Sequence, residues 1–365
     1  MNSLLKVLRQ NPLFWLLAFV PIVFAVAELK PEAHTLLFVL SVLAIVPLAA
    51  MLSHATESVA ARTGDAVGGL LNATLGNLTE LVIALAALRT GQYMLVKASI
   101  AGAIVTNSLF MLGLSFLLGG LKYHVQEFNR TSARIQAGLL FLATVALLMP
   151  SAIAQADSAQ AGLSQRLSLG LACLLIAAYA LGMLFSLKTH RELFASDESS
   201  PQEEGHPTWP IRVAVTMLVV VTVLVALVSE VFVESVQKAA ESFGMTPAFV
   251  GFVVVSLVGA AAEMASAFSA ARKNRLSLSV GIALGSASQI ALFVAPVLVL
   301  LSYVLGPVPM DLQFWPGAVV MILIATLTAT LVTNAGTSAW FTGVLVLTVY
   351  LIFAMTLYLL PPRLS

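Results

Sequence analysis

The sequence predicts an all-α polytopic membrane protein with eleven transmembrane helices: one N-terminal helix followed by two inverted five-helix repeats. The composition, the recurrence of apolar stretches and an internal repeat predict this fold. Of the 365 residues, 59% are hydrophobic and only 10% are charged, whereas ordinary soluble domains have about 25% charged residues. A lipid bilayer is therefore the expected surrounding of most of the chain.

Apolar stretches long enough to cross a bilayer, about 20 residues each, recur along the whole chain. Charges, Gly, Pro or polar clusters separate them. Basic residues precede the first stretch, but no small-residue cleavage pattern follows it, so we expect a retained helix rather than a signal peptide. The predicted spans are 12–27, 35–53, 66–88, 97–119, 135–154, 166–187, 211–236, 246–271, 277–305, 315–333 and 338–360.

One connection between the spans has the composition of a linker. Residues 188–209 are polar and acidic and contain two prolines. They divide the chain into a part with six spans and a part with five. The predicted organisation is an N-terminal helix (1–34), a first repeat (35–187), an acidic cytoplasmic linker (188–209) and a second repeat (210–365).

The distribution of Lys and Arg predicts the orientation in the membrane. With the N-terminus inside, twelve of the 18 Lys and Arg residues fall on the cytoplasmic side and six outside, the bias that membrane proteins show. The N-terminus and the linker are therefore expected in the cytoplasm and the C-terminus outside. A short N-terminus without a long regulatory tail favours a prokaryotic cell membrane.

An internal repeat relates the two halves of the chain. A shift of 183 residues superposes GNLTE (76–80) on GAAAE (259–263), and Gly102 on Gly285. Because a unit of five helices is odd, consecutive copies enter the membrane from opposite sides, so the repeats are inverted. This architecture is typical of secondary transporters, whose substrate site lies near the midplane where the repeats meet.

The repeat gives a pair of carboxylates, Glu80 and Glu263, within apolar sequence. A single buried Glu could be a protonated residue that joins two helices, but matched positions in inverted copies favour a functional site. Two facing carboxylates in a low dielectric repel each other, so they bind either a cation or protons. This mutual exclusion is the minimum that an antiporter requires.

Polar residues near the two carboxylates provide further oxygen ligands. Calcium accepts six to eight oxygens from carboxylates, amides and backbone carbonyls. Ordinary hydrogen bonding between helices is the alternative role for such residues, and glycines at 68–69, 76 and 259 are expected to permit unwound backbone. The candidate ligands beside Glu80 and Glu263 are Asn77, Thr106, Asn107, Ser286 and Gln289.

Other function classes have little support. Glu57 and Glu241 lie near helix ends, where cation access or regulation is one role and simple solvation another. A net charge of +1 gives no argument for nucleic-acid binding, and the histidines show no zinc-ligand spacing. We find no nucleophile and base for an intramembrane hydrolase, so an enzyme is not expected, and neither is a cofactor. Cys173 is the single cysteine and cannot close an internal disulfide.

Two long motifs resemble the signatures of the calcium/proton exchanger family of the cation/calcium exchanger superfamily. They are ATESVAARTGDAVGGLLNATLGNLTELVIALAAL (55–88) and GAAAEMASAFSAARKNRLSLSVGIALGSASQIALFVAPVLVL (259–300). The resemblance covers essentially every helix after the first. It implies eleven helices, an acidic segment between the halves and exchange of cytosolic calcium for protons by alternating access. It also implies that Glu80 and Glu263 are the central cation and proton sites, with Asn107 and Gln289 beside them.

The second motif departs from the family pattern at two positions. The family usually has Gly-Asn-x-Ala-Glu-His, whereas this chain has Ala260 and Met264 at the Asn and His positions. An amide oxygen and an imidazole are therefore absent from the second half, and we expect the first half to hold the ion more strongly. The alternatives are a sodium-driven exchanger of the same superfamily, or broader specificity that includes manganese, sodium or potassium.

Overall fold

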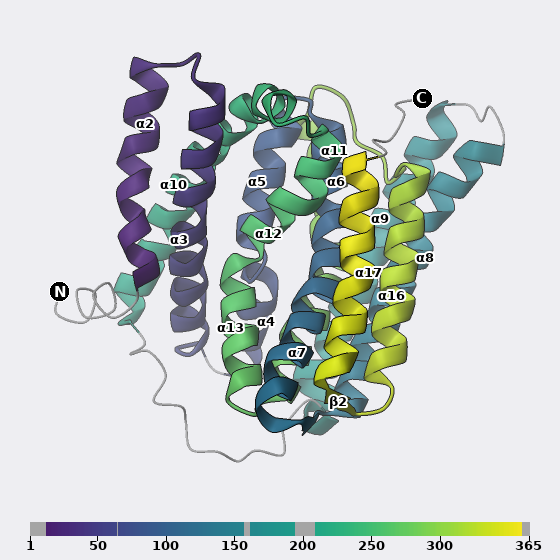
Figure 1. Cartoon of the computed structure of the whole chain (residues 1–365). Coiled ribbons are helices and arrows are strands. Elements are labelled where there is room, and N and C mark those ends of the chain that lie inside the picture. Colours follow the sequence, from purple (N-terminus) through teal and green to yellow (C-terminus); the bar gives the residue numbers. More distant parts are fainter. Residues whose placement is uncertain (1–11, 64, 157–160, 194–208, 360–365) are drawn as a thin grey trace.

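The computed structural model describes residues 12–63, 65–156, 161–193 and 209–359. It is helical almost throughout, and most of the helices run roughly along one direction (Figure 1). The expectations for residues 1–11, for most of the acidic linker (194–208) and for the last residues, 360–365, lie outside the described residues.

The first half of the described chain consists of helices and one short strand. It begins with a 3-10 helix, η1 (Pro12–Ala18), which continues into α2 (Phe19–Leu29). The following elements are α3 (His34–Ala60), α4 (Asp65–Leu75), α5 (Leu78–Arg89), α6 (Tyr93–Val105), the π-helical η2 (Thr106–Met111), α7 (Leu112–Tyr123), β1 (Val125–Glu127), α8 (Arg130–Ala156), α9 (Ala161–Leu184), the π-helical η3 (Phe185–Thr189) and the 3-10 helix η4 (Arg191–Leu193).

The second half of the described chain also consists of helices and one short strand. It begins with α10 (Ile211–Ser242), which packs along α3 more extensively than any other pair of elements. The following elements are α11 (Pro247–Phe249), the π-helical η5 (Val250–Val255), α12 (Ser256–Gly259), α13 (Ala261–Arg272), α14 (Leu276–Gln289), the π-helical η6 (Ile290–Val294), α15 (Ala295–Leu305), α16 (Pro316–Thr333), β2 (Thr337–Ala339) and α17 (Trp340–Leu359).

Within the described residues, eight helices are long and apolar enough to cross a membrane. The segments Pro247–Gly259 and Ala261–Arg272, bent by 59° relative to each other, make a ninth span if they are counted together. The first predicted span corresponds to a shorter apolar helix, Leu13–Leu29. The predicted single span 66–88 is wrong in one respect, because α4 and α5 divide it at residues 76 and 77.

Both helix breaks lie beside a glycine that the sequence singled out. One break follows α4 at Gly76, and the other follows Gly259, where α12 gives way to α13. The same expectation is wrong for residues 68–69, which lie inside α4. A Cβ added at Gly68 would lie 2.2 Å from the carbonyl oxygen of Ala60, so this glycine permits close packing of α4 on the end of α3.

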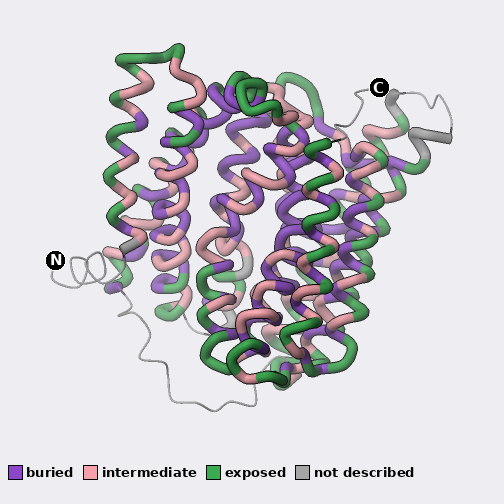
Figure 2. Tube along the Cα trace, in the orientation of Figure 1, coloured by how far each residue is buried: buried purple, intermediate pink, exposed green. Residues whose placement is uncertain are grey.

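The exposed surface fits a bilayer. Figure 2 shows buried residues concentrated on the central helices α5 and α6 and exposed residues along the outer helices. Large apolar side chains are exposed on three of the outer helices: Leu174 of α9 (61%), Leu331 of α16 (75%) and Met355 of α17 (61%). A soluble monomer rarely exposes such a large apolar area, so we conclude that lipid covers these faces.

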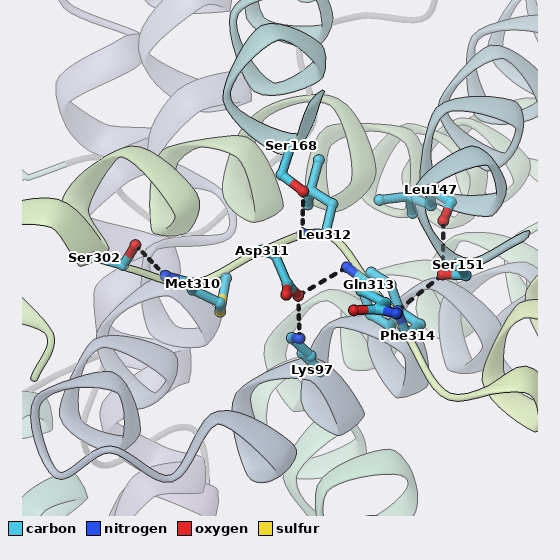
Figure 3. Close-up of polar contacts among 10 residues, drawn as sticks. All are labelled: Lys97, Leu147, Ser151, Ser168, Ser302, Met310, Asp311, Leu312, Gln313 and Phe314. Carbon is cyan, nitrogen blue, oxygen red and sulfur yellow. Dashed lines mark hydrogen bonds and ion pairs between the residues drawn. The ribbon is translucent and has the colours of Figure 1, made fainter. Parts of the chain in front are cut away.

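The two ends of the bundle are closed differently. At one end, β1 pairs antiparallel with β2. At the other end, the connection between α15 and α16 is held among the helices, and Asp311 in it pairs with Lys97 of α6 (Figure 3). Three serines from three helices accept the backbone N–H groups of alternate residues of this connection: Ser302 from Met310 (2.7 Å), Ser168 from Leu312 (3.0 Å) and Ser151 from Phe314 (2.9 Å).

Candidate functional site

Glu80 and Glu263 each lie in the first turn of a helix that starts at a break. The unpaired N–H groups at a helix N-terminus favour negative charge there. Both residues are half-buried overall, but Oε1 and Oε2 of Glu80 and Oε2 of Glu263 are buried and receive no hydrogen bond from the described residues. The two carboxylates are close enough to repel each other.

Each carboxylate lies against the glycine at the other break. A Cβ added at Gly259 would lie 2.9 Å from Cγ of Glu80, and a Cβ added at Gly76 would lie 3.8 Å from Oε1 of Glu263. The two breaks therefore cross at one place, and the absence of side chains at the glycines lets the carboxylates approach. The structure thus brings together the two residues that the 183-residue repeat paired.

Four of the other predicted site residues form one chain of hydrogen bonds. Asn77 Nδ2 donates to Gln289 Oε1 (2.7 Å), and Ser286 Oγ donates to Asn77 Oδ1 (2.7 Å). Asn107 Nδ2 donates to Ser286 Oγ (2.8 Å). Ser286 also contacts the Glu263 carboxylate. Helices of both halves are therefore joined through Asn77 and Ser286.

The buried polar atoms of the site that lack a partner among the described residues are acceptors. Asn107 Oδ1 is buried and has no partner among the described residues, like the carboxylate oxygens of Glu80. A buried acceptor without a donor costs about 1–3 kcal/mol, so such atoms are rarely left unpaired. A cluster of these acceptors is suited to bind positive charge, either as a metal cation or as protons.

Thr106 stands apart from this cluster. Its hydroxyl hydrogen-bonds Ser256 (2.9 Å) and Tyr350 (3.4 Å) rather than another predicted ligand. Sequence reasoning missed both partners. Ser256 is the one polar residue in the run VVVSLVG (253–259), which could have marked it, whereas nothing in the apolar sequence around Tyr350 points to the site.

Two π-helical segments adjoin the polar residues. η2 begins at Thr106 and contains Asn107, and η6 begins directly after Gln289. Such segments are rare and occur frequently at functional sites. Their nearly equivalent places in the two halves indicate that the same irregularity shapes both sides of the cluster.

Glu57 and Glu241 are not part of the central cluster. They lie near the C-terminal ends of α3 and α10. These helices run antiparallel, since Phe38 stacks on Phe232 and Trp209 N donates to Ser58 Oγ, so the two carboxylates lie at opposite ends of the bundle. Glu57 is exposed and accepts a hydrogen bond from Ser53 (3.2 Å). Glu241 lines a surface pocket of about 540 Å³ with Glu32, His34 and Lys238.

The donor set fits a hard cation better than a transition metal. In the described part of the chain, no group of three or more His, Cys, Asp and Glu side chains is placed to hold a metal. The available ligands are carboxylate and amide oxygens, which calcium prefers. A cation in this cluster would therefore be bound through Glu80, Glu263 and neighbouring amides.

A pair of carboxylates and amide oxygens enclosed by apolar helices is suited to binding a cation inside a membrane. The family described as sodium/calcium exchanger protein matches residues 33–188 and 213–359, and the chain belongs to this family of transporters. The Ca(2+)/H(+) antiporter of Synechocystis is 40% identical over 363 residues, covering 95% of this chain and 96% of that protein. The Ca(2+)/H(+) antiporter ChaA of Bacillus subtilis is 39% identical over 354 residues, covering 96% of this chain and 100% of that protein.

A solved structure agrees with these sequence relatives. The structure of native YfkE superposes with a TM-score of 0.82 at 36% identity, over 95% of this chain and 100% of that chain. The resemblance to the calcium/proton exchangers that the two motifs indicated is thereby confirmed.

Proposed function

We propose that this protein is a secondary active transporter that exchanges cytosolic calcium for protons by alternating access, with Glu80 and Glu263 alternately binding cation or protons. The observation that carries the proposal is the pair of buried carboxylates, each against the glycine at the other break. The relatives support the choice of ions, because two that match over nearly their whole length are named Ca(2+)/H(+) antiporters.

Antiport follows from competition for the same oxygens. A divalent cation neutralises both carboxylates of the pair, and two protons do the same. The cation therefore leaves the site only when protons bind, and the protons leave only when a cation binds. Asn107 offers a further oxygen, and Asn77, Ser286 and Gln289 hold the helices of both halves in place. Thr106 lies at the edge of the site, where its hydroxyl hydrogen-bonds Ser256.

We propose eleven spans arranged as an N-terminal helix and two inverted repeats. The repeats are those predicted from the sequence, 35–187 and 210–365. Nine of the eleven spans are the eight long apolar helices and the bent pair described above. The tenth is Leu13–Leu29, and the eleventh is α4 and α5 taken together. The hydrogen bond between Thr144 Oγ1 and Thr326 Oγ1 (2.9 Å) supports the repeats. These residues are 182 apart, one less than the 183-residue shift, and nearly equivalent positions of two repeats meet each other only near a twofold axis. The excess of Lys and Arg places the N-terminus in the cytoplasm and the C-terminus outside.

Everted membrane vesicles test the proposed ions and their coupling together. With the cytoplasmic face outward, an imposed acidic interior should drive calcium accumulation without sodium, and a protonophore should abolish it. Strict dependence on sodium would contradict the proposal and favour a sodium-driven exchanger of the same family. Manganese, sodium and potassium tested in parallel show whether Ala260 and Met264 broaden the specificity.

Substitution of the central carboxylates tests the site. Glu80→Gln and Glu263→Gln should each abolish proton-driven calcium uptake while the protein still inserts in the membrane, because one remaining carboxylate cannot balance a divalent cation. Glu230→Gln is the matched control, since Glu230 is exposed and pairs with Arg89 at the protein surface. Transport at the normal rate in either central variant would refute the assigned site.

A further inference from the structure

Gln136 belongs to α8, outside both sequence motifs, yet its side chain reaches the helix that carries the second motif. α8 packs against α14. A Cβ added at Gly285 of α14 would lie 3.7 Å from Oε1 and 4.0 Å from Nε2 of Gln136. Because Gly285 has no side chain, the amide of Gln136 can lie directly against α14.

The oxygen of the Gln136 amide lacks a hydrogen-bond donor among the described residues. Gln136 Oε1 is buried and accepts no hydrogen bond from the described part of the chain. Nearly all buried polar atoms have a partner, and an exception calls for an explanation such as a bound water or ion. The oxygens of Glu80 and Asn107 share this property, and the proposed cation explains it there.

The contact with Gln136 lies one helical turn from the central site. Gly285 and Gln289 are four residues apart, so they share a face of α14 and are separated by about 6 Å along its axis. Gln289 is the residue that binds Asn77 within the central site. An amide at Gln136 is therefore close to the cation site without being part of its hydrogen-bond network.

The same face of α14 continues toward the beginning of the helix with little protein covering it. Gly281, one turn before Gly285, has no atom within 4 Å of an added Cβ. Both glycines and Gln289 are partly exposed. The face runs from the beginning of α14, which the proposed topology places at the cytoplasmic side, to the central site.

We propose that Gln136 supplies an additional amide oxygen to the divalent cation on its way between the cytoplasm and the Glu80–Glu263 site. It thereby sets the apparent affinity at the cytoplasmic face. Amide oxygens are ordinary ligands of calcium, and a neutral ligand can bind the ion without retaining it. This inference rests on the proposed calcium/proton exchange.

Transport kinetics separate this role from a structural one. In everted vesicles, Gln136→Leu removes the oxygen at similar size and should raise the KM for calcium about tenfold, with the maximal rate nearly unchanged. Gln136→Glu keeps an oxygen and should keep the KM low while making it more sensitive to protons. Ser41→Ala is the control, because it also removes a buried oxygen without a partner among the described residues, the hydroxyl of Ser41 on α3, and should change nothing.

The outcomes distinguish the inference from the function on which it rests. If the wild-type protein shows no proton-driven calcium uptake, the proposed function fails. If the wild-type protein transports and Gln136→Leu leaves the KM unchanged, only the role of Gln136 is wrong. A fall in maximal rate without a change in KM would indicate a structural role and would also overturn the inference.

Cysteine labelling gives a readout that does not depend on transport. Cys173, the single cysteine, is exposed and is first replaced by Ala. In that background, Gln136→Cys should react with a charged, membrane-impermeant thiol reagent applied to the cytoplasmic face, and calcium should slow the reaction. The control Gly138→Cys lies two residues away on an exposed, unoccupied face of α8, where lipid should prevent labelling. Absence of labelling at 136, or labelling that calcium does not slow, would overturn the inference.

Discussion

Gly259 is the residue whose size is most tightly constrained by the site. An added Cβ would lie 2.9 Å from Cγ and 3.3 Å from Oε1 of Glu80, closer than van der Waals contact allows. The Glu80 side chain would have to move, and with it the carboxylate that faces the cation. This glycine is thus needed for the approach of the two halves rather than for a backbone turn.

We predict that Gly259→Ala lowers the apparent calcium affinity by about 10- to 100-fold, the range seen when groups that orient metal ligands are altered. Calcium uptake into everted vesicles, measured over a range of calcium concentrations, checks this. Gly182→Ala is the control, because the nearest atom to its added Cβ is 3.5 Å away, an ordinary contact. Equal affinities in the two variants would show that Glu80 is not held in place by this contact.

The two copies of the motif are unequal at the residue level. Asn77 joins Gln289 and Ser286 by two short hydrogen bonds, whereas the equivalent Ala260 is fully buried and has no polar side chain. The expectation that the first half holds the ion more strongly stays a prediction. What the geometry adds is that the amide of Asn77 already joins the two halves. Asn107 is then the amide of the central site whose oxygen has no partner among the described residues.

At the scale of elements, the segment between α15 and α16 is held by one ion pair, Lys97 with Asp311, in addition to its hydrogen bonds to three serines. Lys97 and Asp311 retain only 18% and 27% of their side-chain exposure, and Asp311 also accepts the backbone N–H of Gln313 (3.0 Å). Removal of one partner would leave the other charge poorly solvated inside the bundle. Such losses are costly, unlike those of surface pairs.

We predict that Lys97→Met destabilises the protein by about 3 kcal/mol, the lower end of the range for a buried pair, because both side chains keep some exposure. The midpoint of thermal unfolding in detergent should fall measurably. Arg89→Met is the matched control: it breaks a pair whose partners are 62% and 47% exposed, and surface pairs contribute at most about 1 kcal/mol. An equal fall in both variants would show that burial of the Lys97 pair is not what matters.

The membrane-spanning helices were easier to predict from the sequence than the breaks within them. Apolar length locates the spans, but predicted 35–53 became His34–Ala60 and predicted 97–119 became Tyr93–Tyr123. Helical backbone continues past the apolar stretch, since polar residues can extend a helix into the interface. Glycine permits either a break or close packing, so residues 68–69 and 76 could not be told apart without their neighbours.

The site was predictable where the repeat provided a comparison and not elsewhere. The repeat selected Glu80 and Glu263 because a matched pair is visible within one sequence. The bond between Asn77 and Gln289 joins residues 212 apart, a pairing that no local pattern contains. Gln136 is one of several polar residues on α8, and only its oxygen without a partner among the described residues and its contact with Gly285 distinguish it.

At the scale of the whole molecule, the number of buried carboxylates limits the protons that each cycle can carry. Among the acidic residues whose side chains are described, all except Glu80, Glu263 and Asp311 are exposed, and Asp311 is paired with Lys97. Two carboxylates remain to exchange protons for the cation. One calcium ion should therefore be exchanged for two protons, which moves no net charge.

Such an exchange is independent of the membrane potential, because the cost for calcium, about 4.6 kcal/mol at 100 mV, equals the gain from two protons. The driving force is then the pH difference alone, about 1.4 kcal/mol per proton and pH unit. We predict that each pH unit sustains a calcium gradient of about 100-fold. The measurement is the steady-state calcium ratio in vesicles at several imposed pH differences, with the potential set separately by potassium and valinomycin. A gradient that grows about 1,000-fold per pH unit, or that shifts with the potential, would require a third proton and a carboxylate beyond Glu80 and Glu263.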